Sequence, residues 1–370
     1  QRGANAAALV LAGRADSALN GFIDGQDSTT VVVNYPPLSG RLAGSTRAVE
    51  AVVTRSVPTF FLGIVGQNGA TVRVRAVGQV GPGTACIFAL NKHAAGTLIV
   101  SGSAAATSGC DALVSSDDPT TAFNMNGNQP LNMGNHSRVG VVGGWSSPNV
   151  WDTIDNVQVD PEHTFDRGDP LAHVPAPVPA DVPNVYPSAR IQPHETANLL
   201  PGVYCGGWDI WGVMNLAPGT YILAGGGMTA HAGSTILGTG VTIYNTSSTS
   251  DNWGCPSSPS YPYASIDLNG QAMLNISAPT TGTLAGIAFF QDRTVTDTTV
   301  HRFNGGASLI IDGAIYFPKS PIQFTGNSSN NGYTYLVADM IDIGGGSSLK
   351  NNTSSLADGS PLRLVATVAE

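Results

Sequence analysis

Six aspartates and two arginines in the second half of the chain are the residues that could perform acid–base chemistry together. Glycoside hydrolysis needs two carboxylates facing one cleft, and a polysaccharide lyase would need an acidic calcium cluster beside an Arg or Lys base. The full set is Asp209, Asp251, Asp267, Asp292, Asp297, Asp312, Arg293 and Arg302. We favour a solvated loop for residues 291–299 and turn hydrogen bonds for Asp267 and Asp312. The sequence therefore predicts no catalytic residue.

Other patterns for catalysis or metal binding are absent from the sequence. There is no G-x-S-x-G nucleophile motif, and the seven histidines are scattered along the chain. His194-Glu195 lacks a second histidine four residues after the first, where Asn198 stands. Asp24-Gly-Gln-Asp27 lacks the spaced acids of a calcium loop and is better interpreted as a turn. We expect no cofactor and no metal ion.

Cysteines and tryptophans give the remaining candidate site residues. Four cysteines split two and two, which favours the disulfides Cys86–Cys110 and Cys205–Cys255 and an oxidising compartment; four free thiols are the alternative. The second pair would bring together Trp208, Trp211 and Trp253. Exposed, these rings would form a platform for sugars or a partner protein. Buried, they would cap the first coil of a repeat structure, which we favour.

Composition limits the function classes. The 370 residues are only 11% charged and 42% hydrophobic, with 45 glycines, 24 prolines and a net charge of −9. This composition is typical of a turn-dense β protein. So few cations argue against binding to nucleic acid and against docking on anionic lipid. The sequence contains no apolar span of membrane-crossing length and no initiator Met, so we expect a processed or truncated form.

Residues 199–350 repeat a glycine-punctuated template. Gly233, Gly270, Gly306 and Gly346 lie 37, 36 and 40 residues apart, and short apolar runs follow each of them. In this alignment Ile236 matches Leu309, Ile243 matches Tyr316, and Met273 takes the place of Ile236. Two coils of about 18–20 residues would fill each repeat, which predicts a right-handed parallel β-helix, or solenoid. The alternative is a Gly-rich antiparallel sandwich.

The whole chain divides into four parts, beginning with an N-terminal module at 1–81. Alanine and leucine spacing over residues 1–24 predicts one helix, followed by strands at 29–34, 46–55, 59–65 and 70–80. This small α+β module resembles a pilin head in outline. We expect early solenoid coils at 82–150, a Pro-rich strap or linker at 151–198, and the main solenoid at 199–370, closed by a last strand at 362–368.

Several segments of the chain are similar to TadG-like proteins of the Tad (tight adherence, Flp) pilus system. The Ala-rich residues 1–13 resemble the segment that follows the membrane helix in that family, and residues 33–40, 48–54 and 58–61 resemble the rest of its N-terminal module. Further similar segments lie at 169–172, 200–207, 218–222 and 313–318. Asn5 is a departure, because an acidic residue is common at that position.

The resemblance implies an envelope protein with its bulk outside the cell, anchored in the inner membrane by a helix that would lie before Gln1. It also implies a non-catalytic role in pilus biogenesis and adhesion. The expected partners are other Tad pilus components or copies of this chain, bound through the N-terminal helix, with surface polysaccharide as a further candidate. The alternative is a β-helix carbohydrate-active enzyme or a carbohydrate-binding surface protein.

Overall fold

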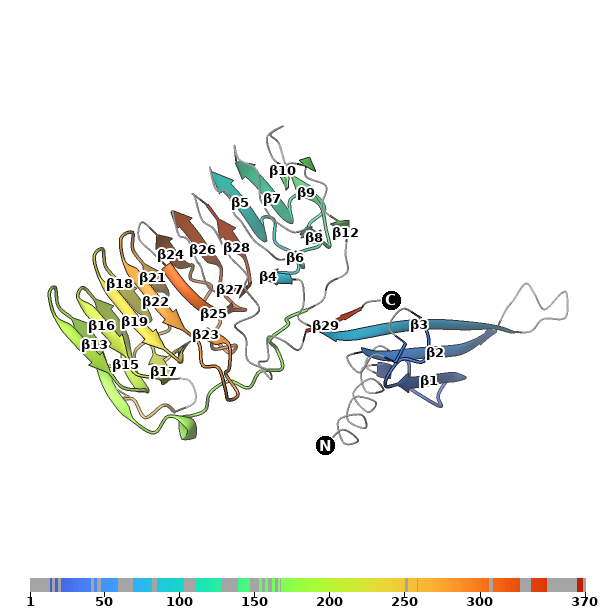
Figure 1. Cartoon of the computed structure of the whole chain (residues 1–370), viewed down its shortest axis with the longest axis horizontal. Coiled ribbons are helices and arrows are strands. Elements are labelled where there is room, and N and C mark those ends of the chain that lie inside the picture. The colour runs from blue at the N-terminus through green and yellow to red at the C-terminus, as the bar shows by residue number, and fades with distance from the viewer. Residues whose placement is uncertain are drawn as a thin grey trace. The chain divides into compact units, whose positions relative to one another are not determined.

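A computed structural model of the chain divides it into two compact units, residues 1–83 with 363–370, and residues 84–362. The structure describes residues 14, 17–18, 21–40, 43–44, 48–58, 69–81, 85–102, 111–127, 139–146, 153–154, 157–158, 162–163, 166, 168–249, 252–257, 259–305, 309–326, 334–344 and 365–368. Figure 1 labels the strands of both units.

The N-terminal unit contains a four-stranded antiparallel sheet in the order β1-β2-β3-β29. Its strands are β1 (Thr29–Asn34), β2 (Ala48–Pro58), β3 (Gly69–Gly81) and β29 (Val365–Val368). β1 has the bounds that the sequence predicts, because the β-branched run TTVVVN is followed by two prolines. The strand predicted at 59–65 lies outside the described residues.

Most of the predicted N-terminal helix also lies outside the described residues. Residues 14, 17 and 18 are helical, and Gly21, within the predicted range of 1–24, lies in a turn. The Phe22 N–H donates to the Ser17 carbonyl at 2.9 Å, and Gly21 has a φ of 83°. This left-handed glycine followed by a bond back to the last turn is a common helix terminator.

The position of β29 corrects the expectation that residues 362–368 close the solenoid. β29 pairs antiparallel with β3, with Val365 opposite Gly81 and Val368 opposite Gly78. Alternation of apolar residues predicts a strand but cannot specify which sheet it joins. The second unit is therefore inserted between two strands, β3 and β29, of the N-terminal sheet.

The second unit is a parallel β-helix, which confirms the predicted fold class. One sheet of 23 strands follows the coils from end to end. The strands preceding the Pro-rich segment are β4 (Ala85–Ala89), β5 (Leu98–Gly102), β6 (Asp111–Val114), β7 (Phe123–Gly127), β8 (Val139–Val141), β9 (Trp145–Ser146) and β12 (Glu162–His163). β10 (Thr153–Ile154) and β11 (Val157–Gln158) form a separate antiparallel pair.

The strands after the Pro-rich segment supply the remaining coils. They are β13 (Val185–Ile191), β14 (Thr196–Leu199), β15 (Gly202–Ile210), β16 (Val213–Leu216), β17 (Gly219–Ala224), β18 (Met228–Ala230), β19 (Thr235–Thr239), β20 (Val241–Thr246), β21 (Ile266–Leu268), β22 (Met273–Ser277), β23 (Ile287–Gln291), β24 (His301–Gly305), β25 (Leu309–Phe317), β26 (Ile322–Gly326), β27 (Thr334–Ala338) and β28 (Ile341–Ile343).

The coils have three faces that differ in chemistry. An uncharged face is formed by β14, β16, β19, β22 and the first half of β25. A charged face runs through β18, β21, β24, β26, β28, β5 and β7. A covered face contains β17, β20, β23, β27 and β4, and its strands β20, β23 and β4 are buried at every position.

The order of the coils along the rod differs from their order in the chain. β27 pairs with β4, placing Leu336 beside Ile87, and β28 pairs with β5, placing Ile341 beside Leu98. Figure 1 shows β5, β7 and β9 continuing the row of strands after β28. Residues 85–146 therefore extend the far end of the helix built by residues 185–343, even though they precede it in sequence.

The predicted coil length of about 18–20 residues is too short by a factor of two between β19 and β22 and between β22 and β25, whereas Ile322 of β26 pairs with Ile341 of β28, 19 residues later, as predicted. Thr235 of β19 pairs directly with Met273 of β22, so one 37-residue interval is one coil whose loops are long. The register also moves by one residue, because Leu274, not Met273, lies beside Ile236. On the covered face Ile243 pairs with Phe289, which pairs with Ile315, not Tyr316. A bulge between Ile287 and Phe289 accounts for that shift.

The proline-dense strap, residues 168–184, packs against the β-helix. Leu171, Val174 and Val182 are each at most 5% exposed. Tyr316 of β25 donates its hydroxyl hydrogen to Asp169 at 2.5 Å. The strap connects β12 to β13, and thus one end of the rod to the other, and its apolar side chains help to bury the covered face.

Candidate functional site

The cysteines predicted to pair in the second unit are bonded. Cys205 of β15 and Cys255 form a disulfide with a Cα–Cα distance of 5.6 Å. Cys86 of β4 is also disulfide-bonded, and its predicted partner, Cys110, lies outside the described residues. The Cys205–Cys255 disulfide connects the loop after β20 to β15 in the second coil. This bond holds the loop over the covered face.

The three tryptophans do not form one exposed platform. Trp208 is 3% exposed and packs edge-on against Tyr204 and Tyr221. Trp253 is 2% exposed and lies 5.9 Å from Tyr244 on the covered face. Only Trp211 is exposed, at 41%. Two of the three rings therefore fill space within the fold, and one remains available to a ligand.

Trp211 stands at the corner where the charged face meets the uncharged face. Its ring is stacked on the ring of His231, with centroids 3.6 Å apart and planes 11° from parallel. His231 Nε2 lies 2.8 Å from Asp209 Oδ1, and Arg190 Nε lies 3.3 Å from Asp209 Oδ2. Three consecutive coils thus contribute a stacked corner that places one indole at the surface.

The candidate acids of the enzymatic alternative are used in local contacts. Asp292 is 2% exposed and accepts hydrogen bonds from the Thr246 hydroxyl at 2.6 Å and from Thr294 at 2.8 Å. Asp297 accepts the Thr299 backbone N–H at 2.7 Å. Asp267 accepts the Ser265 hydroxyl. Asp312 lies on β25 of the uncharged face, and Asp251 lies outside the described residues.

Arg293, the candidate lyase base, instead fastens the strap. Its guanidinium donates to the Val174 carbonyl at 2.9 Å and to the Leu171 carbonyl at 2.7 Å. Nε donates to the Tyr316 hydroxyl at 2.7 Å, and the group lies about 5 Å from the ring centroids of Phe290 and Tyr316. In all of these contacts the guanidinium acts as a permanently charged hydrogen-bond donor. This suits a residue that fastens the strap and not a proton acceptor.

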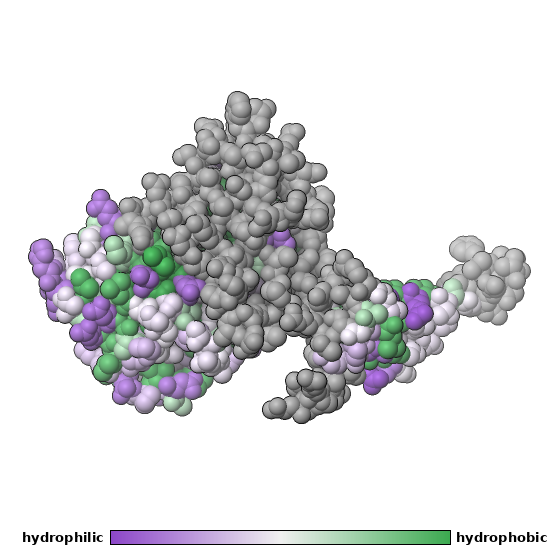
Figure 2. All heavy atoms as spheres, viewed as in Figure 1, coloured by the Kyte–Doolittle hydropathy of each residue, from purple (hydrophilic) through white to green (hydrophobic). Residues whose placement is uncertain are grey.

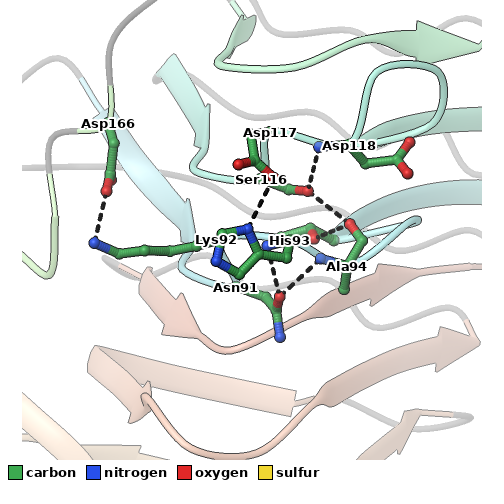
Figure 3. Close-up of polar contacts among 9 residues, drawn as sticks. Asn91, Lys92, His93, Ala94, Ser116, Asp117, Asp118 and Asp166 are labelled. Atoms are coloured by element: carbon green, nitrogen blue, oxygen red, sulfur yellow. Dashed lines mark hydrogen bonds and ion pairs between the residues drawn. The ribbon is translucent and has the colours of Figure 1, made fainter.

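A His–Asp pair beside a buried serine has the residue types of a catalytic triad but not its geometry. His93 Nδ1 lies 2.9 Å from Asp117 Oδ1, and both side chains are exposed; Figure 3 draws these residues with Ser116. The Ser116 hydroxyl donates to the Ala94 carbonyl at 2.7 Å. A nucleophilic serine would instead donate to the histidine, so this cluster is structural.

The same cluster lies at the junction where β27 and β28 pair with β4 and β5. The Asn91 side chain donates to the Asp339 carboxylate at 3.1 Å and accepts the backbone N–H groups of His93 and Ala94. Lys92 Nζ lies 3.0 Å from Asp166, which precedes the strap. These contacts, drawn in part in Figure 3, connect two coils distant in sequence.

A neutral histidine lies inside the β-helix. His301 is buried, and its Nδ1 accepts the Ile266 N–H at 2.9 Å, so the proton stays on Nε2, which donates to the Tyr263 hydroxyl at 2.8 Å. Gln291 donates to Tyr263 and to the Ser320 hydroxyl, both at 2.7 Å. Burial lowers the pKa of His301 to about 3, against the opposing charge of Asp297.

Sequence reasoning missed the buried carboxylate of the N-terminal unit. Glu50 of β2 accepts hydrogen bonds from Arg75 at 2.6 Å, Asn34 at 2.8 Å, the Ser39 hydroxyl at 3.1 Å and the Leu38 N–H at 3.2 Å. The Arg75 guanidinium and these donors lower the Glu50 pKa to about 2. The signal was present, because Glu50, Asn34 and Ser39 all lie in segments that carry the Tad resemblance.

The Glu50 network contacts Leu38 and Ser39 of the segment that follows β1. Arg75 also donates to the Ser39 carbonyl at 2.5 Å. Leu38, in the same segment, is 74% exposed. An apolar side chain presented next to a buried ion pair is suited to contact with another protein.

Metal-ligand clusters and membrane-spanning helices are both absent from the residues that the structure describes. No group of three or more potential metal ligands occurs there. No helix there combines the length and the hydropathy that crossing a bilayer requires.

Residues 1–77 match the model of a protein family described as Tad-like Flp pilus-assembly. No curated protein matches the chain, and no solved structure does. The matched residues include β1, β2 and most of β3 with the whole Glu50 network, and they end before the β-helix begins. The first 77 residues are therefore similar to a Tad-like Flp pilus-assembly family, which supports a protein of the Tad system, and this similarity does not extend into the β-helix.

Proposed function

We propose that the protein is an extracytoplasmic, non-catalytic component of the Tad pilus, in which the N-terminal unit contacts other pilus components and the β-helix is the surface used for attachment. The observation that carries this proposal is the insertion of the β-helix between β3 and β29. Both ends of the β-helix segment join the unit that matches the pilus-assembly family, so whatever holds that unit also carries the rod.

Two further observations support the location and the absence of catalysis. Disulfide bonds at Cys205–Cys255 and at Cys86 suit an oxidising compartment outside the cytoplasm. The acids and the arginine that best fitted a carbohydrate-active enzyme are committed to Thr246, Thr299, Ser265 and the strap. An anchor upstream of Gln1 and contacts through the N-terminal helix remain part of the proposal.

The test compares cells that make the full chain, cells that lack it, and cells whose chain carries Leu38→Asp. Loss of the protein should reduce surface attachment, and gold-labelled antibody against the β-helix should label the cell exterior near pili. Leu38→Asp should leave the folded protein intact but reduce its recovery with sheared pili. Normal attachment and piliation in cells lacking the protein would contradict the proposal.

The enzymatic alternative has its own assay. We expect purified protein incubated with neutral and acidic polysaccharides to release neither reducing ends nor unsaturated products. Sustained turnover that Asp292→Asn or Arg293→Gln abolishes, with the fold retained, would replace the structural role by a catalytic one.

A further inference from the structure

The uncharged face of the β-helix differs from the other two faces in being both exposed and nearly free of charge. One outward column across its five strands reads Asn198, Asn215, Leu237, Asn275 and Ile310. A parallel column ends in Thr235 and Met273, of which Met273 is 41% exposed. The one charged side chain on the described strands of this face is Asp312.

The charged face provides the contrast within the same rod. Five of the seven residues in its outward column are charged, and the column reads Arg190, Asp209, Thr229, Asp267, Arg302, Gln323 and Asp342. The covered face is closed by the strap and by the disulfide-tied loop. In a chain of net charge −9, an open surface without charge on five neighbouring strands is a distinct chemical environment.

The polar groups of the uncharged face are side-chain amides and hydroxyls, interrupted in the outward column by Leu237. Asn215 donates a side-chain N–H to the side-chain amide oxygen of Asn198 at 2.9 Å. These two amides are therefore aligned along the rod axis. Adjacent strands are about 4.8 Å apart, a spacing similar to the advance per residue of an extended β-linked sugar chain. Trp211 borders this face, two residues before β16, and exposes an aromatic ring.

We propose that the uncharged face, from the Trp211 corner to Met273, binds a neutral polysaccharide whose chain lies along the rod axis. Amides and hydroxyls would exchange hydrogen bonds with sugar hydroxyls, Leu237 and Met273 would contact the apolar faces of the sugar rings, and Trp211 would stack on one ring. This inference deepens the proposed role in attachment by naming the ligand class, and it rests on that role.

The face is less suited to the two competing ligands. An acidic polymer would find no cation among its described outward residues and would approach a chain of net negative charge. A second copy of the chain would need a continuous apolar centre. Leu237, Met273 and Ile310 are instead separated by Asn and Thr, and Figure 2 shows hydrophilic and hydrophobic residues interspersed over the coils at this end.

The test is electrophoresis of the full chain in native gels that contain a neutral polysaccharide, either hydroxyethylcellulose, galactomannan or dextran, or else alginate as the acidic one. At least one neutral polysaccharide should retard the protein, and alginate should not. Trp211→Ala should weaken binding about fivefold, in line with the loss of one aromatic contact. Asn275→Lys should weaken it about tenfold or more, because the added side chain blocks the outward column.

Gln323→Lys is the matched control. It makes the same change of charge at an outward strand position of the charged face, where the new ammonium would remain beside Asp342, and it should bind as the unsubstituted chain does. Absence of retardation by all three neutral polysaccharides, equal retardation by alginate, or equal loss in both lysine variants would overturn the proposal. So would a dimer in sedimentation that Asn275→Lys dissociates, which would assign the face to a second copy. Each of these results concerns polysaccharide binding by the purified chain, whereas the proposed function is tested by pilus association in cells. Failure of this inference can therefore be distinguished from failure of the proposed function.

Discussion

In the N-terminal sheet, Glu50 is buried as a carboxylate whose charge Arg75 balances, whereas in the β-helix His301 is buried as a neutral ring that bonds to Tyr263 and Ile266. The N-terminal sheet buries little behind its strands. Its polar network reaches solvent through the Arg75 side chain, which is 28% exposed. The β-helix has a long closed interior where an ion would lose its hydration without compensation. A buried group can therefore stay charged where its partner reaches solvent, and it is neutral where the interior is closed.

The arginines of the β-helix give the largest expected effect. Arg293→Ala should destabilise the second unit by about 3–4 kcal/mol, because three charged hydrogen bonds and the strap contact are lost together. Arg302→Ala is the matched control, since Arg302 is 47% exposed and lies 3.7 Å from Asp267, and it should cost under about 1 kcal/mol. Urea unfolding followed by tryptophan fluorescence measures both, because all five tryptophans lie in residues 84–362. An equal decrease in the free energy of unfolding in both variants would mean that the strap does not depend on the Arg293 contacts.

The ion pair of the N-terminal unit should come next. Glu50→Ala should destabilise that unit by about 2–3 kcal/mol, because Arg75, Asn34 and the Leu38 N–H lose a charged acceptor. Hydrogen exchange should show faster exchange in β1 and β2, while the fluorescence transition of the β-helix stays unchanged. Val32→Ala, at a 43% exposed position of β1, is the control. Unaltered exchange in Glu50→Ala would show that the network is not needed for the fold.

Acid should act on the two units at different pH. The folded-state pKa of His301 is about 3, below its usual 6.5, so the unfolded chain binds the proton first and β-helix stability falls as pH decreases from 6.5 toward 3. The Glu50 pKa is about 2 against the usual 4.5, so the N-terminal unit loses stability only as pH decreases from 4.5 toward 2. His301→Gln should flatten the first dependence by about 2–3 kcal/mol between pH 6.5 and 4.5. An unchanged slope in that variant would assign it to other groups.

The smallest effect is expected at the joint between β27 and β4. Asn91→Ala removes the bonds to Asp339, His93 and Ala94 and should cost about 1 kcal/mol. The loss should appear in hydrogen exchange as weaker protection of β4 and β5, with β17 to β20 unaffected. Thr299→Ala, in an exposed loop, serves as the control. Uniform loss of protection along the rod would indicate that the joint is not a separate contact.

The sequence was sufficient for local structure and for fold class. Residues 29–34 could be assigned as β1 because a β-branched run is bounded by turn residues, and the glycine-bounded runs of 199–350 indicated parallel coils. The N-terminal resemblance was also correct. The tryptophans could be divided into buried and exposed only from the structure, because Trp253 lies in the loop after β20 and is buried where that loop folds back on Tyr244.

Non-local pairing was beyond the sequence. Any coil presents similar backbone edges to any other, so nothing in residues 85–146 indicates that they follow residue 343 in space. The same holds for β29, whose apolar alternation would suit either unit. The role of Glu50 was missed for a related reason, since its donors come from three segments that only the sheet register brings together.

Removal of residues 363–370 tests the insertion of the β-helix into the Tad-like unit most directly. The shortened chain should lose hydrogen-exchange protection in β3, above all at residues 78–81, while its tryptophan fluorescence transition in urea should match that of the full chain. An unchanged β3 together with a destabilised β-helix would contradict the account, because it would place the last strand on the rod.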